Sequence, residues 1–180
     1  DGYTGAGSRI AIIDTGLDLD HPSFDESAYL YGLELSAAKF GKEISDYNLL
    51  TEEEVAKVLP SLHASTLLPG LSAGELYRNA KVPYAFNYID QGLDVTHDAD
   101  SQGDHGTHVS GIATANTYVW AKDADGDRIP ARQENGVVGI APDAQILPMK
   151  VFGKAGGAYD DDYMAAIEDA ILLDCDSVNL

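Results

Sequence analysis

The stretch Gln102-Gly103-Asp104-His105-Gly106-Thr107-His108-Val109-Ser110-Gly111-Ile112 decides how the rest of the chain is interpreted. A histidine followed by small and apolar residues suits the first turn of a buried helix, and an imidazole projecting from there into a cleft suggests catalysis. Two other interpretations stay open. His105 and His108 could bind a metal ion, although no glutamate lies between them as in the metalloprotease motif H-E-x-x-H. Both could also be structural histidines at a helix start.

A second stretch, Arg9-Ile10-Ala11-Ile12-Ile13-Asp14-Thr15-Gly16-Leu17-Asp18, predicts a buried strand that ends at a carboxylate. Four apolar residues in a row, bounded by polar residues and glycine, are typical of a strand covered on both faces. In open α/β sheets the functional groups gather at the carboxyl ends of the strands, where Asp14 would lie. Because a buried carboxylate is costly without a partner, we expect Asp14 to pair with His105.

Three blocks of the sequence together resemble the subtilisin-like serine proteases, family S8. They are A-I-I-D-T-G-L-D from residue 11, H-G-T-H-V-S-G-I from residue 105, and G-V-V-G-I-A-P-D-A-Q-I-L-P-M-K-V from residue 136. The blocks occur in the order found in that family. Two further segments, K-V-P-Y-A-F-N-Y-I-D from residue 81 and A-I-E-D-A-I from residue 166, are most similar to bacterial cell-envelope proteinases of the lactocepin and C5a-peptidase group.

The resemblance implies both a fold and a chemistry. The fold is α/β, a parallel sheet in three layers with helices on both faces, and the activity is serine endopeptidase cleavage of proteins or peptides. His105 would be the general base and Asp14 would hold the imidazole in the right tautomer. The positive end of the helix dipole at His105 disfavours an imidazolium, which helps to keep the ring neutral. The family also implies a bacterial protein outside the cell or in the cell envelope.

The serine nucleophile of the Asp-His-Ser order is missing from these residues. No segment like G-T-S-M-A occurs, and no serine lies at a helix start beside a glycine-rich turn. We therefore expect residues 1–180 to be the N-terminal part of a single catalytic domain, incomplete on its C-terminal side. Such a piece would need the remainder of the domain as its partner, would be unstable without it, and would be inactive alone.

The composition excludes several classes of protein. The chain has 30 acidic and 11 basic residues, a net charge of −19 at pH 7, which argues against nucleic acid and anionic membranes as partners. The acidic balance gives weak support to an exported protein. Cys175 is the single cysteine, so no internal disulfide is possible. No apolar run approaches the length of a membrane span, and Asp1 looks like a mature or trimmed end rather than the start of a signal peptide.

An insertion at about residues 27–81 separates the two catalytic candidates. Asp14 and His105 lie much further apart in sequence than in a minimal subtilisin, and an unstructured loop of that length is improbable. The capping pattern Thr51-Glu52-Glu53-Glu54 predicts a helix over 51–59, with Val55, Val58 and Leu59 as its apolar stripe and Pro60 as its end. We interpret the insertion as packed surface decoration, with an exosite as the alternative.

Acidic residues are concentrated at two further places. Asp94, Asp98, Asp100 and Asp104 precede His105; we interpret them as a solvated loop, with electrostatic tuning of the site as the alternative. Asp123, Asp125 and Asp127 resemble the beginning of a calcium loop, but the glycine falls at the wrong position and the closing glutamate is missing. They are candidates for a structural calcium, with a plain acidic hairpin as the alternative. The chemistry itself requires no cofactor and no metal.

The region after residue 136 predicts a substrate-binding edge. Gln145–Val151 reads as a strand, and a glycine-rich segment follows it. In the family, the matching segment pairs with the extended peptide substrate, so the resemblance makes Phe152, Gly153, Gly156 and Gly157 substrate-binding candidates. A flexible loop without substrate contact is the alternative. We also predict a strand over 83–90 and a helix from Asp160, in which the residues facing the sheet are Met164, Ile167, Ala170 and Ile171. Within the His105 helix, we expect His108 to be hydrogen-bonded in the core.

Two rival functions stay open on the sequence alone. One is a catalytically inactive subtilisin-like binding or scaffold module, which keeps the fold and the peptide-pairing edge. The other is a metal-dependent hydrolase that uses Asp14, Asp104, His105 and His108. Insensitivity to serine-directed reagents would separate the second from a serine protease.

Overall fold

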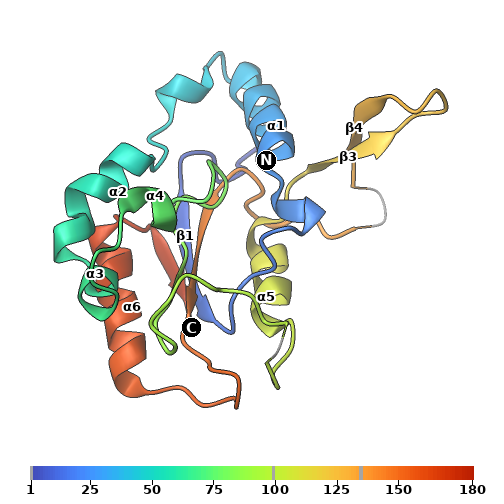
Figure 1. Cartoon of the computed structure of the whole chain (residues 1–180). Helices are drawn as coiled ribbons and strands as arrows, with labels where there is room; N and C mark the ends of the chain where they lie inside the picture. The colour runs from blue at the N-terminus through green and yellow to red at the C-terminus, as the bar shows by residue number, and fades with distance from the viewer. Residues whose placement is uncertain (1, 99, 134–135) are drawn as a thin grey trace.

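A four-stranded parallel sheet forms the centre of the structure. The computed structural model describes residues 2–98, 100–133 and 136–180. The strands lie in the order β2-β5-β1-β6, so the first strand pairs with strands from near the far end of the chain (Figure 1). Their bounds are Arg9–Asp14 for β1, Phe86–Asn87 for β2, Gln145–Lys150 for β5 and Ser177–Asn179 for β6.

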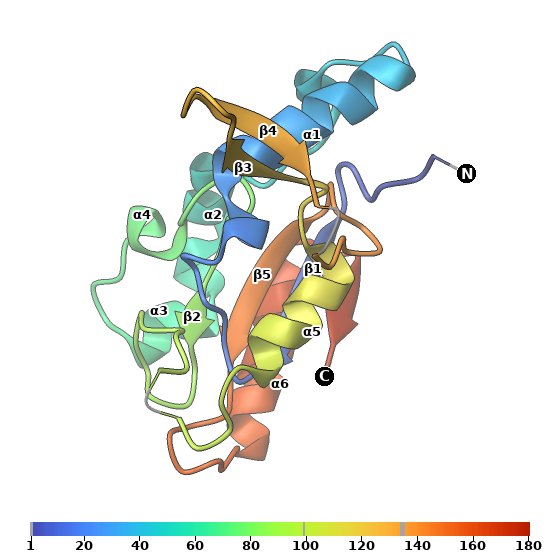
Figure 2. The ribbon, with the colours of Figure 1, turned by 90° about the vertical axis from the view of Figure 1, so that its right-hand side faces the viewer.

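Helices cover both faces of this sheet, which confirms the predicted three-layer α/β architecture. Helix α5, His105–Thr114, lies along one face, and Figure 2 shows it beside β1. Helix α6, Asp160–Leu172, lies on the other face together with α2, α3 and α4. Alternate residues of the strands point to opposite faces, so Ile12 and Ile146 pack toward α5, whereas Ile13 and Met149 pack toward α6.

The insertion contributes four helices. Their bounds are Glu26–Lys39 for α1, Glu52–Val58 for α2, His63–Leu67 for α3 and Ala73–Leu76 for α4, with short 3-10 turns at Ile44–Asp46 and Leu59–Ser61. A further 3-10 turn, Pro22–Phe24, precedes the insertion. The predicted helix after Thr51 is confirmed: Thr51 and Glu54 form a reciprocal capping box, and the α-helix ends before Pro60. Surface decoration is the wrong description of this region, because Leu50, Val55, Leu62 and Leu76 are buried in the core shared with the sheet.

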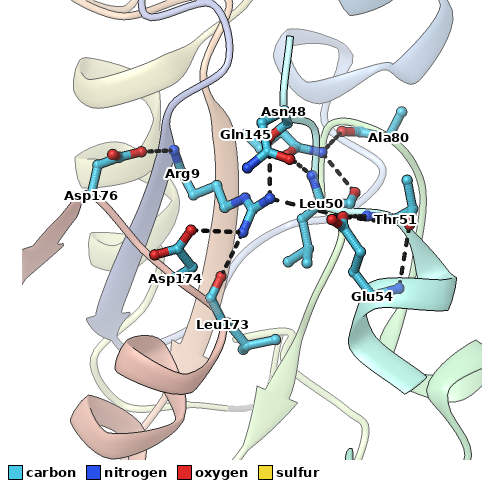
Figure 3. Close-up of polar contacts among 10 residues, drawn as sticks. All are labelled: Arg9, Asn48, Leu50, Thr51, Glu54, Ala80, Gln145, Leu173, Asp174 and Asp176. Carbon is cyan, nitrogen blue, oxygen red and sulfur yellow. Dashed lines mark hydrogen bonds and ion pairs between the residues drawn. The ribbon is translucent and has the colours of Figure 1, made fainter. Parts of the chain in front are cut away.

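Two polar side chains from the sheet bind the backbone of the insertion (Figure 3). The Arg9 guanidinium donates hydrogen bonds to the carbonyls of Asn48 and Leu173, at 3.1 and 3.0 Å. Gln145 exchanges hydrogen bonds with the backbone of Leu50, at 2.6 and 3.1 Å, and donates another to the Ala80 carbonyl at 2.8 Å. Because each partner is buried or partly buried, these bonds fix the insertion to one end of the sheet.

The strand predicted over 83–90 is shorter than expected. Only Phe86–Asn87 pairs with β5, as β2. Asn87 then exchanges hydrogen bonds with the backbone of Gly92, so the chain turns back on itself directly after the strand. The alternating pattern indicated an extended segment, but the turn between Asn87 and Gly92 ends the pairing with β5 after two residues.

The buried face of α6 also differs from the predicted one. Of the four residues predicted to face the sheet, Ala170 is buried and Ile167 packs against the core, but Met164 and Ile171 are 58% and 69% exposed. Ala165, Ala166 and Asp169 are buried in their place. Small side chains let the helix approach the sheet closely. Asp169 is tolerated in the core because it accepts hydrogen bonds from the backbone of His63 and Ala64 and from the hydroxyl of Tyr88. Burial still raises the pKa of this carboxyl.

A hairpin projects from the globular body near α1. Its strands are β3, Tyr118–Lys122, and β4, Arg128–Arg132, which pair in antiparallel register. The Arg128 guanidinium lies 4.6 Å from the centre of the Trp120 ring, and the Trp120 ring N–H donates to the Ser27 hydroxyl of α1. Within the described residues, no helix is both long enough and apolar enough to cross a lipid bilayer.

Lys81 is the most completely buried cation of the fold. Its ammonium donates to the carbonyls of Thr114, Pro142 and Ala144 at 2.7, 2.9 and 2.8 Å, which joins the end of the insertion to α5 and β5. Burial lowers the pKa of Lys81 from its ordinary 10.5 to about 7. The Lys81 side chain is therefore the hydrogen-bond donor to three buried backbone carbonyls.

Replacing Lys81 by Met is expected to destabilise the protein by roughly 3 kcal/mol, because three buried carbonyls lose their donor. The folded pKa lies below the unfolded one, so unfolding takes up a proton between about pH 7 and pH 10.5. The wild-type free energy of unfolding should therefore rise with pH in that window, by up to about 1.4 kcal/mol per pH unit, and the variant should lack this slope. Calorimetric unfolding of wild type and variant, both full-length, at pH 6.5, 8 and 9 measures the loss of stability and its dependence on pH. Parallel pH curves for the two proteins would contradict the prediction.

Candidate active site

Asp14 and His105 form a hydrogen-bonded pair at the carboxyl end of the sheet. The two carboxylate oxygens lie 2.9 and 3.0 Å from Nδ1 of His105, across a sequence separation of 91 residues. Asp14 is the last residue of β1 and is only 5% exposed, whereas the His105 side chain is 65% exposed. A buried carboxylate thus holds one nitrogen of a ring that is otherwise open to solvent, as a general base requires.

The sequence predicted this pair but missed the hydroxyls that hold it. The Thr15 hydroxyl accepts the backbone N–H of Gly106 at 2.9 Å, and the Thr107 hydroxyl accepts the N–H of Asp18 at 2.8 Å. The N–H of Thr15 in turn donates to Asp14 at 2.6 Å. The turn after β1 and the first turn of α5 are therefore joined by two reciprocal bonds. The available sequence signal was a threonine close after each candidate residue, Thr15 directly after Asp14 and Thr107 two residues after His105.

Glycine at position 106 lets these two segments meet. A Cβ atom there would lie 2.3 Å from the Gly16 carbonyl oxygen and 3.1 Å from a carboxylate oxygen of Asp14. Both neighbours are fixed, one as backbone and the other as the partner of His105. Any larger residue at this position would push α5 away from β1.

The four substrate-binding candidates lie in the segment that leaves β5. The backbone of Gly153 donates to the Gly157 carbonyl at 3.0 Å, so the segment makes a tight turn, and Gly156 has a positive φ of 81°. The Gln102 amide, three residues before His105, donates to the Gly156 carbonyl at 2.7 Å. Phe152 is half-buried, and its ring packs edge-on against Tyr163 with 5.8 Å between the ring centres. The segment thus lies beside the approach to His105.

His108 is exposed, which corrects the expectation of a histidine hydrogen-bonded in the core. It lines a cavity of about 400 Å³ together with His21, His97, Asp104 and Thr107, and neither Asp14 nor His105 belongs to this cavity. The four proposed ligands of a metal-dependent hydrolase therefore do not converge. In the part of the chain that the structure describes, no three His, Cys, Asp or Glu side chains are placed to hold a metal ion.

The three calcium candidates lie at the tip of the β3–β4 hairpin. The Asp123 carboxylate accepts the backbone N–H groups of Asp125 and Asp127, at 3.0 and 2.9 Å, so it stabilises the turn itself. These contacts explain the alternating aspartates as turn formers. Calcium binding here stays a prediction, which a rise in the unfolding temperature with added calcium would test.

The acidic residues before His105 do not share one environment. Asp94 and Asp98 are exposed, whereas the Asp100 side chain is 4% exposed and forms an ion pair with Lys150. Hydrogen bonds from the Thr96 hydroxyl and backbone hold the pKa of Asp94 below its ordinary value, and the charges of Lys150 and Lys154 lower it further. A solvated loop is thus the wrong description for Asp100.

Comparison with known proteins agrees with this geometry. The family model described as the subtilase family matches residues 5–180. The PI-type proteinase of Lactococcus lactis subsp. cremoris is 33% identical over 99% of this chain, which spans 8% of that relative's length. The C5a peptidase of Streptococcus pyogenes is 29% identical over 98% of this chain, which spans 12% of that relative's length. The minor extracellular protease Vpr of Bacillus subtilis is 25% identical over 99% of this chain, which spans 14% of that relative's length.

The family model, the three-layer fold and the Asp14–His105 pair point to the same conclusion. The match extends over both residues of the pair and over the segment that follows β5. On these grounds the chain belongs to the subtilase family of proteases.

Proposed function

We propose that the chain supplies the base and its orienting carboxylate to a serine endopeptidase that works through an Asp-His-Ser triad. The observation that carries this proposal is the bond from buried Asp14 to Nδ1 of solvent-exposed His105. In the described residues, no serine hydroxyl hydrogen-bonds to His105. The nucleophile is therefore expected from sequence of the full-length protein outside residues 1–180.

Each residue of the pair has a separate task in this mechanism. His105 takes the proton of the serine hydroxyl as the serine attacks the peptide carbonyl, and later gives it to the leaving amine. Asp14 keeps the Nδ1 proton on its own side of the ring, which leaves Nε2 free to accept, and stabilises the imidazolium as it forms. His105 is the first residue of α5, so its ring projects from the end of the helix that lies beside Asp14.

The substrate is a protein or peptide in an extended conformation. The segment from Phe152 to Gly157 leaves the end of β5 beside the approach to His105, and the Gln102–Gly156 bond holds it there. Its glycines permit close approach of another backbone, as strand addition needs. The relatives are named as proteinases, which supports this substrate class, and Vpr is named as an extracellular protease, which supports a location outside the cell or in its envelope.

Labelling with a fluorophosphonate probe tests the proposal. The full-length protein should form a stoichiometric adduct on a serine outside residues 1–180, seen by intact mass and peptide mapping, and the His105→Ala variant should form none. Asp20→Asn, an exposed change on the turn after β1, is the matched control and should be labelled normally. Folded wild-type protein that takes no label would overturn the proposal and favour the inactive binding module.

A further inference from the structure

A buried ion pair lies beside the strand end that carries Asp14. Lys150 ends β5 and Asp100 lies in the loop before α5, and their side chains are 2% and 4% exposed. Burying both charges is costly unless each is paired and hydrogen-bonded. Such a pair needs an explanation beyond stability, because apolar residues of similar size often stabilise a core equally well.

Lys150 reaches the active site through the backbone. It is the register partner of Asp14 on the neighbouring strand, so both side chains project from the same face of the sheet. Its ammonium donates to the Thr15 carbonyl at 2.6 Å, and the Thr15 hydroxyl accepts the N–H of Gly106. One cation therefore fixes the turn that holds both Asp14 and the first turn of α5.

Asp100 connects the same cation to the substrate segment. The residue after it, Ser101, donates its backbone N–H to the Lys154 carbonyl at 3.0 Å, and Gln102 donates to the Gly156 carbonyl at 2.7 Å. The loop that precedes His105 thus binds Lys150 through Asp100, and binds the segment after β5 through Ser101 and Gln102. The other titratable or charged groups in or around this loop are Asp14, Asp94, His97, Asp98, Asp104 and Lys154.

We propose that Lys150 and Asp100 are positioning residues for the proposed protease chemistry: their ion pair aligns His105 with Asp14 and with the substrate segment, and balances the charge near the imidazole. This inference rests on the proposed function. Neither residue touches the reacting atoms, so both act through Thr15, Gly106 and the loop before α5.

The test compares how the fluorophosphonate labelling rate of the full-length protein depends on pH in four variants. Asp100→Asn keeps the shape and leaves Lys150 uncompensated. Lys150→Met removes the cation and its bond to Thr15, and the double variant removes both charges. Glu168→Gln is the matched control, because it removes an exposed carboxylate of α6 that pairs with His63 of α3. Calorimetry of each variant reports whether it is folded.

The two single variants should move the acid limb of the rate profile in opposite directions. Excess positive charge disfavours the imidazolium, so Asp100→Asn should extend labelling to lower pH by about 0.5–1 unit, and Lys150→Met should move the limb upward by a similar amount. The double variant should return to the wild-type midpoint. Lys150→Met and the double variant should label about 10–100-fold more slowly, because the bond to Thr15 is lost.

Outcomes that contradict this inference differ from those that contradict the proposed function. If the wild type is labelled but both single variants keep its midpoint and rate, as Glu168→Gln should, the pair is only structural and the inference is overturned. The inference is also overturned if the single variants label a smaller fraction of the protein but keep the wild-type midpoint of the pH–rate profile and the wild-type rate. If the wild type takes no label, the proposed function itself fails.

Discussion

Replacing Asp14 by Asn is expected to lower kcat of the full-length protein by about 10⁴-fold, the size of loss known for the corresponding group of subtilisin itself. The asparagine amide can donate to Nδ1 of His105 where the carboxylate can only accept, so the ring adopts the wrong tautomer. Asp14 is buried and both its oxygens lie within 3.0 Å of Nδ1, so solvent cannot substitute for it. Single-turnover labelling and peptide hydrolysis both measure the effect.

The Asp20→Asn variant provides the comparison for this experiment. Asp20 is exposed on the same turn, so removing its charge should change kcat less than about 2-fold. A loss at Asp14 of less than about 10-fold would mean that the carboxylate does not set the tautomer of the base.

Replacing Gly106 by Ala is expected to reduce the labelling rate by about 100-fold or more and to destabilise the fold by roughly 2–3 kcal/mol. The added methyl group would lie 2.3 Å from the Gly16 carbonyl oxygen, which belongs to backbone and cannot rotate away. The helix must therefore move from β1, and His105 moves with it. Labelling rate and calorimetric midpoint, measured on the full-length protein, give the two numbers.

Gly111 offers a matched substitution in the same helix. A Cβ atom there meets nothing within 4 Å, so Gly111→Ala should keep the labelling rate and stabilise the helix by about 0.5–1 kcal/mol. If both alanine variants behaved alike, close contact at Gly106 would not be what aligns the pair.

The sequence predicted the central pair because each partner has a local signal. Asp14 follows an apolar run that must be a buried strand, and His105 begins a run of small residues that must be a helix start. Both signals depend only on neighbouring residues. The parallel three-layer sheet, by contrast, was expected from the resemblance of three sequence blocks to the subtilisin-like family rather than from local pattern, and the structure contains it.

Features that depend on distant partners could not be predicted in this way. Asp100 looks like any loop carboxylate until β5 brings Lys150 beneath it, 50 residues further along the chain. The face of α6 that packs against the sheet is defined by alanines and by Asp169, and a hydrophobicity pattern ranks Met164 and Ile171 above them. At Asp100 and on α6, contacts with residues distant in sequence determine which side chains are buried, and the periodicity of the local sequence contains no information about those contacts.

The order of strands has a consequence for how the chain is made. β1 is synthesised before both of its neighbours in the sheet, β5 and β6, and the bond from Arg9 to Asp176 spans 167 residues. The apolar strand that carries Asp14 therefore has no strand partner until residues 145–179 have been translated. Folds with such distant pairings form slowly and expose aggregation-prone edges meanwhile. We therefore expect the yield of folded protein to depend on how well this nascent strand is covered before β5 and β6 are made.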